Sequence, residues 1–461
     1  MRTNRIVSAA LAGWGAIGLA TTAHATNGYQ LIGVGAYQKG MGGAVTANPG
    51  SAMTAITNPA GMAAVGNRAD FSMELFMPDR YNDFTATGGD KQDSEAKSYG
   101  VPAIGWTAPV SEGSDFYFGG GMYGTSGLGV DYGVTDFVVN PPQNTDLQFT
   151  GYSNIAFWQA APTLAWRASD RLKVGISLNL DYQSVAFQER ISGQFGGNAL
   201  DTNFNLARTA NAFGYGISAG LLYDVSERVT VGFSYKSPQS FEDLEFQLSG
   251  DGAGGSVDDI NQFPNGKGNF VYANSGTYKM DLDYPQQAAL GIKVQPVERL
   301  KVSADVKWIN WSATLDDLAV TGGFDVVSPA GSPVAGGARE AALDPGWDDQ
   351  IVYAVGADYA ATDRLRLRAG FNYSQTPIDQ EDVFANAIFP AMVETHLSLG
   401  ATYLINRHWD VSLAFMKAFE NEEKGKGDIP ESFRAAGFSE DSNAKIALEE
   451  ETYSINVGYR F

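Results

Sequence analysis

The chain of 461 residues contains no cysteine and only 3 histidines. Without cysteine it can form neither a disulfide framework nor a metal site built on thiolates. Because His24 lies near the start, only His396 and His408 remain for the rest of the chain, which argues against a metal centre with several histidine ligands. We therefore expect no metal and no cofactor.

Basic residues and long apolar runs are also scarce. The chain has 31 lysines and arginines against 52 aspartates and glutamates, a net charge of -21. This balance argues against a nucleic-acid partner and against a pore selective for anions, although the charges that line a pore matter more than the total. After the first 25 residues there is no run of about 18 apolar residues, so no transmembrane helix is predicted.

The start of the chain has the pattern of an export signal. Arg2 and Arg5 precede a mostly apolar stretch, and Ala23-His24-Ala25 offers small residues at a cleavage site. The stretch is too short and too weakly apolar for a transmembrane helix. We predict that residues 1–25 are a signal peptide that is removed and that the mature chain begins at Thr26.

The end of the chain, residues 452–461, alternates between polar and apolar side chains. In a strand this alternation places all the apolar side chains on one face. The pattern resembles the closing strand of bacterial outer-membrane barrels, which faces lipid on one side and typically finishes on Phe. We expect this strand to be recognised by the barrel-assembly machinery; an ordinary amphipathic strand is the alternative. The apolar face consists of Tyr453, Ile455, Val457, Tyr459 and Phe461.

Short polar turns recur along the chain, and most are followed at once by the same alternation. Several are variants of x-[ST]-[DE]-R, and the sequences after Arg171, Arg299 and Arg364 are clear cases. Six such turns, which join seven hairpins, predict an all-β fold, a 14-stranded antiparallel transmembrane β-barrel over residues 68–461. The turns lie at 111–114, 168–171, 225–228, 296–299, 361–364 and 405–408.

The predicted strands alternate between short turns and long loops. In outer-membrane barrels the short turns usually lie at one rim and the long loops at the other. The alternative fold, a soluble β-sandwich, has no reason to separate its loops by length. The strands are predicted at 68–78, 98–109, 115–124, 150–167, 171–188, 208–224, 228–240, 279–295, 300–313, 349–360, 364–375, 394–404, 408–420 and 450–461. The long loops are predicted at 79–97, 125–149, 189–207, 241–278, 314–348, 376–393 and 421–449.

Residues 26–67 do not have the pattern of strands. They are rich in Gly and Ala and nearly uncharged, and they include the runs Gly40-Met41-Gly42-Gly43-Ala44 and Asn58-Pro59-Ala60-Gly61. A segment with so few charges needs to be buried, and in a barrel it can be buried in the lumen. The alternative interpretation is a disordered leader in the periplasm. We expect the Asn58-Pro59 corner to anchor the segment and its start, Thr26 to Leu31, to touch a substrate.

These runs resemble the FadL family of outer-membrane transporters for long-chain fatty acids and other hydrophobic compounds. Met41-Gly42-Gly43-Ala44 and Asn58-Pro59-Ala60-Gly61 match motifs of the family's N-terminal hatch, which closes a 14-stranded barrel. The resemblance implies a hatch at 26–67, a location in the bacterial outer membrane, contact with its lipid and lipopolysaccharide, and no enzyme activity; we expect a monomer. Further matches are Pro285-Gln286-Gln287, Asp305-x-x-Trp308-x-x-Trp311-Ser312, 397–403 and Tyr459-Arg460-Phe461.

The resemblance also implies a route for the substrate. The family releases substrate sideways where the third strand kinks, and Gly119, Gly120 and Gly121 lie in that strand here. Consecutive glycines permit a bulge, but they can equally relieve crowding. The loop 376–393 offers an apolar surface that either captures substrate or packs the barrel mouth; its candidate residues are Phe384, Ile388, Phe389 and Met392.

By strand parity several charged side chains face the lumen. A fatty-acid carboxylate could pair with one of the bases, or the bases could form internal ion pairs with Asp181, Asp305 and Asp358. The substrate is therefore open between long-chain fatty acids and aromatic or aliphatic hydrocarbons. The bases are Lys293, Lys301, Lys307, Arg366 and Arg368.

Two other classes of protein compete with a transporter of hydrophobic small molecules. A general porin would share the barrel but would not need an apolar N-terminal segment. A barrel hydrolase would need a Ser/His/Asn constellation, and His396 and Ser398 are only two residues apart on one predicted strand, with no third partner in the sequence. We therefore expect no catalytic residues.

Overall fold

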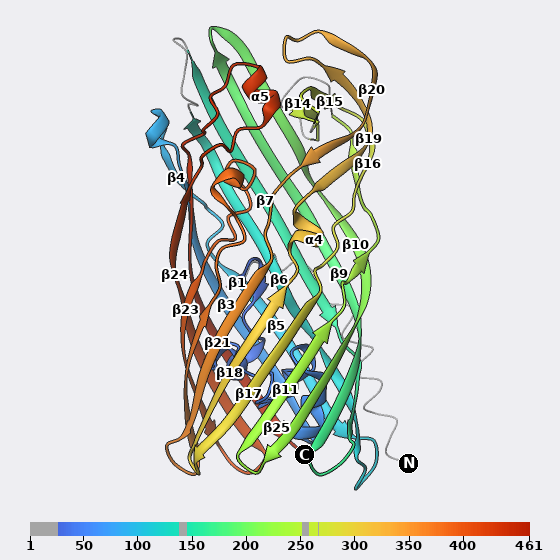
Figure 1. Cartoon of the computed structure of the whole chain (residues 1–461), viewed down its shortest axis with the longest axis vertical. Coiled ribbons are helices and arrows are strands. Elements are labelled where there is room, and N and C mark those ends of the chain that lie inside the picture. The colour runs from blue at the N-terminus through green and yellow to red at the C-terminus, as the bar shows by residue number, and fades with distance from the viewer. Residues whose placement is uncertain (1–25, 138–144, 251–257, 266) are drawn as a thin grey trace.

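The computed structural model describes residues 26–137, 145–250, 258–265 and 267–461 (Figure 1). The predicted signal peptide, 1–25, lies outside the described residues, as do parts of the predicted loops 125–149 and 241–278. The described strands form a closed 14-strand antiparallel barrel, in which the last strand pairs with the first. The predicted fold class is therefore confirmed.

The barrel wall is one continuous sheet of tilted strands (Figure 1). The fourth position around it is shared by β7 and β8, because Ala161-Pro162 interrupts that strand. The wall strands are β3 (Arg68–Asp83), β5 (Tyr99–Pro109), β6 (Phe116–Phe137), β7 (Asp146–Ala160), β8 (Thr163–Arg167), β9 (Leu172–Phe195), β10 (Asn198–Ser226), β11 (Val229–Lys236), β17 (Gln287–Val297), β18 (Leu300–Ile309), β21 (Gln350–Ala360), β22 (Leu365–Tyr373), β23 (Thr395–Leu404), β24 (Trp409–Lys424) and β25 (Lys445–Arg460).

The strands form because their side chains alternate between lipid and lumen. In β9, Ile176, Leu178 and Leu180 are 53%, 48% and 46% exposed, whereas the polar residues between them are buried. The same alternation holds in β18, where Ser303 and Asp305 are buried. Exposed apolar side chains are stable on such a surface only against lipid. The predicted parity is confirmed in these strands.

The six predicted short turns all lie at one end of the barrel, where the chain also ends (Figure 1). The long connections lie at the other end and carry secondary structure of their own. Their elements are η4 (Thr85–Thr87), β4 (Lys91–Asp93), β12 (Ser240–Phe241), β13 (Leu244–Leu248), β14 (Ile260–Pro264), β15 (Phe270–Ala273), β16 (Gly276–Met280), α4 (Ser312–Leu315), β19 (Leu318–Val327), β20 (Pro333–Leu343), η5 (Gln380–Asp382) and α5 (Glu431–Ala435).

The predicted loop 189–207 is wrong. Strands β9 and β10 continue through it and remain paired up to Phe195 and Asn198, so that only a tight hairpin joins them. Gly196 and Gly197 form this turn with φ of 58° and 83°, which glycine adopts without strain. Strand β6 likewise continues to Phe137. Neighbouring strands supply the backbone partners, so the ladder continues past the ends that the local sequence pattern predicts.

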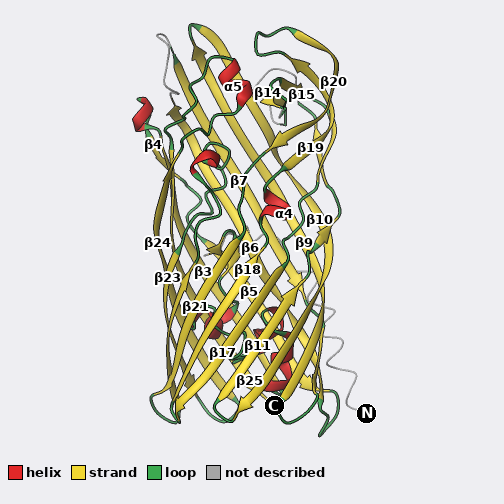
Figure 2. Cartoon of the chain, in the orientation of Figure 1, coloured by secondary structure: helices red, strands yellow, loops and turns green. Residues whose placement is uncertain are grey.

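The N-terminal segment (residues 26–67) lies inside the half of the barrel that carries the short turns, where Figure 2 shows its short helices. Most of its side chains are buried. Among the described residues, no helix is both long enough and apolar enough to cross a membrane. The elements of the segment are β1 (Thr26–Asn27), β2 (Gln30–Leu31), α2 (Gly35–Gly40), η2 (Ala52–Ile56), η3 (Pro59–Gly61) and α3 (Met62–Val65).

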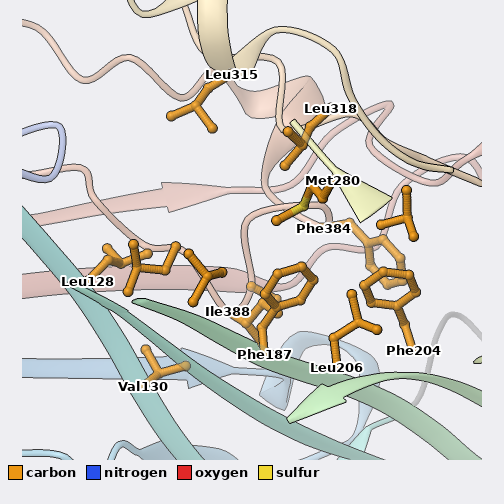
Figure 3. Close-up of a cluster of buried hydrophobic side chains, with 14 of the residues drawn as sticks. Leu128, Val130, Phe187, Phe204, Leu206, Met280, Leu315, Leu318, Phe384 and Ile388 are labelled. Atoms are coloured by element: carbon orange, nitrogen blue, oxygen red, sulfur yellow. The ribbon is translucent and has the colours of Figure 1, made fainter. Parts of the chain in front are cut away.

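The main apolar core lies in the other half of the barrel interior. It is built from lumen-facing side chains of β6, β9 and β10 and from the long connections that fold inward over them. Figure 3 shows Leu128, Phe187 and Leu206 of the wall converging with Met280 and Ile388 of these connections. Apolar side chains thus occupy much of the lumen on this side of the N-terminal segment.

Candidate functional site

The glycine run of the N-terminal segment lies directly against the barrel wall. Gly42 has φ of 63°, and a Cβ atom there would lie 2.8 Å from the backbone nitrogen of Phe371. A Cβ atom at Gly370 of β22 would overlap Gly42 in turn, and Gly40 and Gly400 face each other in the same way. Glycine is therefore needed on both sides, because the two backbones touch.

The Asn58-Pro59 corner is bonded both to its own segment and to the wall. The Asn58 side-chain oxygen accepts a hydrogen bond from the Ala60 amide at 3.1 Å and caps η3. Its amide donates to the carbonyl oxygen of Thr46 at 2.8 Å and to that of Leu221, in β10, at 3.2 Å. Pro59 occupies the first position of the helix, where its missing N–H costs nothing.

The start of the segment carries an aromatic cluster. The ring of Tyr29 stacks on Phe157 with centroids 5.4 Å apart and lies 4.6 Å from Trp311 and 5.6 Å from Trp347. Tyr284 meets it edge-on at 5.9 Å. These rings come from the N-terminal segment, β7 and the long connections, and together they form an apolar partition across the lumen.

A small apolar cavity of about 30 Å³ has Tyr29 in its lining. No charged side chain lines it. Several of its residues belong to the core in Figure 3. The lining also includes Leu128, Ile155, Val185, Phe187, Met280, Leu282, Leu315, Leu318, Pro345, Trp347 and Phe389.

A wider cavity of about 350 Å³ lies among the long connections. Phe204, Phe384 and Phe433 line it together with charged residues such as Asp382. Leu318, Pro345 and Phe389 line both this cavity and the small apolar one. The two cavities therefore adjoin each other across these three residues.

The four candidate capture residues of the loop 376–393 lie inward. Phe384, Ile388 and Met392 are only 8%, 2% and 0% exposed, and Phe389 is partly buried against Phe187 with ring centroids 5.6 Å apart. Hydrogen bonds fix the loop: Ser153 donates to the Ile388 carbonyl at 2.6 Å. These residues line or pack the inner cavities in this structure, and their role in capture stays a prediction.

The three glycines of β6 form an irregular part of the wall. They pair with β5, but on the other side only Gly119 is paired, because Gly120 and Gly121 face the Ala161-Pro162 interruption. The Ala161 amide donates to Gly121 at 2.9 Å. A Cβ atom at Gly120, where φ is 124°, would overlap the Ala161 carbonyl. Close backbone approach therefore accounts for Gly120, and lateral exit here stays a prediction.

A second irregularity of β6 was not predicted. Gly124 and Ser126 pair with consecutive residues of β7, which leaves Thr125 as a bulge without a partner. From inside the barrel, Gln30 pairs with Ser126, and the Gly127 amide donates to the Tyr29 carbonyl at 3.1 Å. The start of the N-terminal segment is thus hydrogen-bonded to the wall beside the bulge.

Thr125 lines a cavity of about 90 Å³ that has both polar and apolar residues in its lining. Gln30, Lys236 and Lys307 share this lining. Both lysines donate to glutamine side chains at 3.2 Å, Lys307 to Gln30 and Lys236 to Gln159. Lys307 was predicted from strand parity, whereas Lys236 was not.

The other predicted lumen bases lie nearer the short turns. Arg366 forms an ion pair with Asp358 at 3.0 Å, and Arg368 lies 3.7 Å from the same carboxylate. Lys301 lines a small cavity with these two arginines. Lys293 is partly buried near Lys301. Internal ion pairing therefore accounts for Arg366 and Arg368.

His396 and Ser398 are both buried on β23. Within the described part of the chain, neither ring nitrogen of His396 nor the Ser398 hydroxyl has a hydrogen-bond partner. A serine nucleophile needs a histidine within hydrogen-bond reach, so these two residues do not form a catalytic pair here.

Known proteins with similar sequences or structures share this architecture. Residues 12–461 match the family model described as outer membrane protein transport protein (OMPP1/FadL/TodX). The chain is 22% identical to outer membrane protein P1 of Haemophilus influenzae over 391 residues, which cover 78% of this chain and 75% of that protein. The toluene transporter TodX of Pseudomonas putida has the same fold, with a TM-score of 0.69, 20% identity and coverage of 93% and 99% of the two chains. A FadL homologue of Pseudomonas aeruginosa gives a TM-score of 0.66 at 16% identity, with coverage of 94% and 100%.

Proposed function

Because the chain belongs to the outer membrane protein transport protein family (OMPP1/FadL/TodX), we propose that it carries hydrophobic small molecules across the outer membrane. One observation carries the proposal: an apolar cavity without charged residues lies inside the barrel, bounded by Tyr29 of the N-terminal segment. Apolar solutes gain free energy on leaving water for such a site, whereas ions and sugars lose hydration there.

The route begins in the wider cavity among the long connections. Leu318, Pro345 and Phe389 border both cavities, so a movement of these residues would admit the solute to the apolar interior. Tyr29 and its aromatic neighbours then form the barrier. Displacement of Thr26 to Leu31 would break the contacts with Ser126 and Gly127 and open a path to the Thr125 bulge. A solute drives this change only if it binds the open arrangement more tightly than the closed one.

Long-chain fatty acids are the first candidate substrates. Lys236 and Lys307 line the cavity at the Thr125 bulge and donate to neutral glutamines. Asp305 lines the same cavity, but neither lysine is at ion-pair distance from an acid among the described residues, so each ammonium group can take a carboxylate partner. Aromatic or aliphatic hydrocarbons are the second candidates. The absence of charge around the apolar cavity favours them, since they need no base at all.

Uptake by intact cells tests both candidates. Cells that lack the protein and cells that carry it would receive a labelled long-chain fatty acid or labelled toluene. The double variant Lys307→Met with Lys236→Met is expected to lower fatty-acid uptake about 10-fold, because the carboxylate would lose one charge-assisted hydrogen bond. Toluene uptake should stay unchanged, because toluene has no charge to pair. Lys267→Met, which removes an exposed loop lysine, serves as the control. Equal uptake of both compounds with and without the protein would refute the proposal.

A further inference from the structure

We propose that cleavage before Thr26 creates a buried ion pair between the new α-ammonium group of Thr26 and the carboxylate of Glu450, and that this pair fixes the start of the N-terminal segment inside the barrel. The cleavage is the one expected from Ala23-His24-Ala25. The acceptor, Glu450, lies in β25, the strand that closes the barrel.

The geometry places the two groups together. The Thr26 nitrogen donates to Glu450 Oε2 at 3.1 Å, and the Thr26 hydroxyl donates to Oε1 at 3.4 Å. Both residues are 2% exposed. A carboxylate therefore already faces the nitrogen atom that would become the mature N-terminus.

Glu450 differs from the buried acids around it because no described lysine or arginine lies at ion-pair distance from it, although Arg80 and Lys39 act on it from farther away. Glu74 pairs with Lys39 at 2.9 Å, and Asp70 pairs with Arg68 at 2.6 Å. Among the described residues, the basic group at ion-pair distance from Glu450 is the imidazole of His396, at 4.0 Å. A buried carboxylate without a cation is costly, and the mature N-terminus would supply the missing charge.

The chemical step is the hydrolysis of one peptide bond by an envelope endopeptidase. The bond between the Ala25 carbonyl carbon and the Thr26 nitrogen breaks; water gives its hydroxyl group to the carbon and a hydrogen to the nitrogen. The new carboxyl group then loses a proton and the new amine gains one. A neutral N–H donor thus becomes an ammonium group with three donors and a positive charge.

His396 offers an acceptor for one of the added donors. Neither of its ring nitrogens has a hydrogen-bond partner within the described residues, although the side chain is completely buried. A neutral imidazole carries one lone pair that accepts a hydrogen bond. The imidazole lies 4.0 Å from Glu450, so an ammonium group paired with that carboxylate would come close to it.

The ion pair would act on the barrier to transport. Thr26 and Asn27 pair with Leu31 and Gln30 in a short hairpin, with Tyr29 near its tip. The same hairpin carries the Gln30 contact to Ser126. Glu450 would hold one arm of this hairpin while the tip bounds the apolar cavity. This consequence rests on the proposed function, whereas the ion pair itself does not.

Labelling of the α-amine tests the ion pair directly. The purified mature protein in detergent would first be sequenced from its N-terminus and then treated at about pH 7 with an acylating ester that favours α-amines over lysines. The parent is expected to begin at Thr26 and to react at least about 10-fold more slowly than after unfolding, since its amine is protonated and buried. Glu450→Gln, which keeps the shape but not the charge, is expected to react about 10-fold faster than the parent. Glu449→Gln on the same strand is the matched control.

A second variant keeps the proposal testable if Glu450→Gln does not fold. Insertion of one alanine between Ala25 and Thr26 moves the ammonium group away from Glu450 and restores a peptide amide at Thr26. The insertion is expected to lower the melting temperature by about as much as Glu450→Gln does. Because both changes remove the same ion pair, the double variant should have no lower a melting temperature than either single variant. A different first residue, a parent amine as reactive as the unfolded one, or additive effects would overturn the ion pair. Altered labelling with unchanged uptake of both fatty acid and toluene would overturn only its link to transport.

Discussion

Lys39 of the N-terminal segment and Glu74 of the first barrel strand form an ion pair of 2.9 Å that is almost completely shielded from water. Lys39→Met would leave Glu74 buried without a cation, at a cost of about 3–5 kcal/mol. We expect the segment to loosen and the leakage of small polar solutes to rise. Single-channel conductance in a planar bilayer would measure the leak. Lys39→Met combined with Glu74→Leu removes both charges and should seal again; an equally leaky double variant would contradict the explanation.

The Asn58 corner gives a second prediction. Asn58→Ala removes the hydrogen bonds to the Thr46 and Leu221 carbonyl groups and should cost about 1–3 kcal/mol, because these buried acceptors lose their donor. Sensitivity of cells to a large polar antibiotic should increase. Asn211→Ala, on the exposed face of the same strand as Leu221, is the control and should change nothing. Equal sensitivity of both variants would mean that Asn58 does not anchor the segment.

Much of the wall could be predicted because its pattern is local. Alternation between apolar and polar residues in β9 and β18 follows from the geometry of a single strand, and the short turns carry their own residue preferences. The ends of the long strands could not be predicted, because pairing between residues such as Phe195 and Asn198 depends on partners rather than on local sequence. The polar sequence at residues 189–207 therefore predicted a loop, although the backbone pairing of β9 and β10 continues through it.

Less of the candidate site than of the barrel wall could be predicted from the sequence. The prediction that Thr26 to Leu31 touch a substrate stays a prediction, but Tyr29 does bound the apolar cavity. Its aromatic neighbours, such as Phe157 and Trp311, are far apart in the chain and meet only in the closed barrel. The Thr125 bulge is a property of the register between two strands, which no local pattern contains.

Tyr29 allows a test of the aromatic partition. Its hydroxyl is buried without a hydrogen-bond partner among the described residues, so Tyr29→Phe should raise the free energy of unfolding by about 1 kcal/mol or leave it unchanged. Tyr29→Ala removes the ring from the cavity and should cost about 3–5 kcal/mol while opening the lumen. Thermal unfolding and conductance would be measured for both. A leaky Tyr29→Phe variant would show that the hydroxyl, rather than the ring, closes the path.

The long connection that carries η5 should respond to pH. Burial, and then the neighbouring carboxylates of Asp379 and Glu381, raise the pKa of Asp382 from 3.8 to about 7. Between these two pH values Asp382 is protonated in the folded loop but ionised in the unfolded loop. Its contribution to the stability of the folded loop is therefore complete below the pKa of the unfolded state and is lost as the pH rises through the pKa of the folded state.

Residues 376–393 should therefore be better protected from hydrogen exchange at about pH 5 than at about pH 8, after correction for intrinsic rates. Asp382→Asn should remove this difference. Asp363→Asn, in a short turn at the other end of the barrel, is the control. A loop whose protection keeps the same pH dependence in Asp382→Asn would show that another group controls it.

The length of β10 has a consequence for where a solute leaves water. The strand has 29 residues, about 95 Å of chain at roughly 3.3 Å per residue. Only about 10 of these residues are needed to cross an apolar band about 25 Å tall. Phe204 and Leu206 of the protruding part face the apolar core rather than solvent. In the transport proposed above, a hydrophobic molecule would thus meet apolar protein surface before it reaches the membrane-spanning part of the barrel.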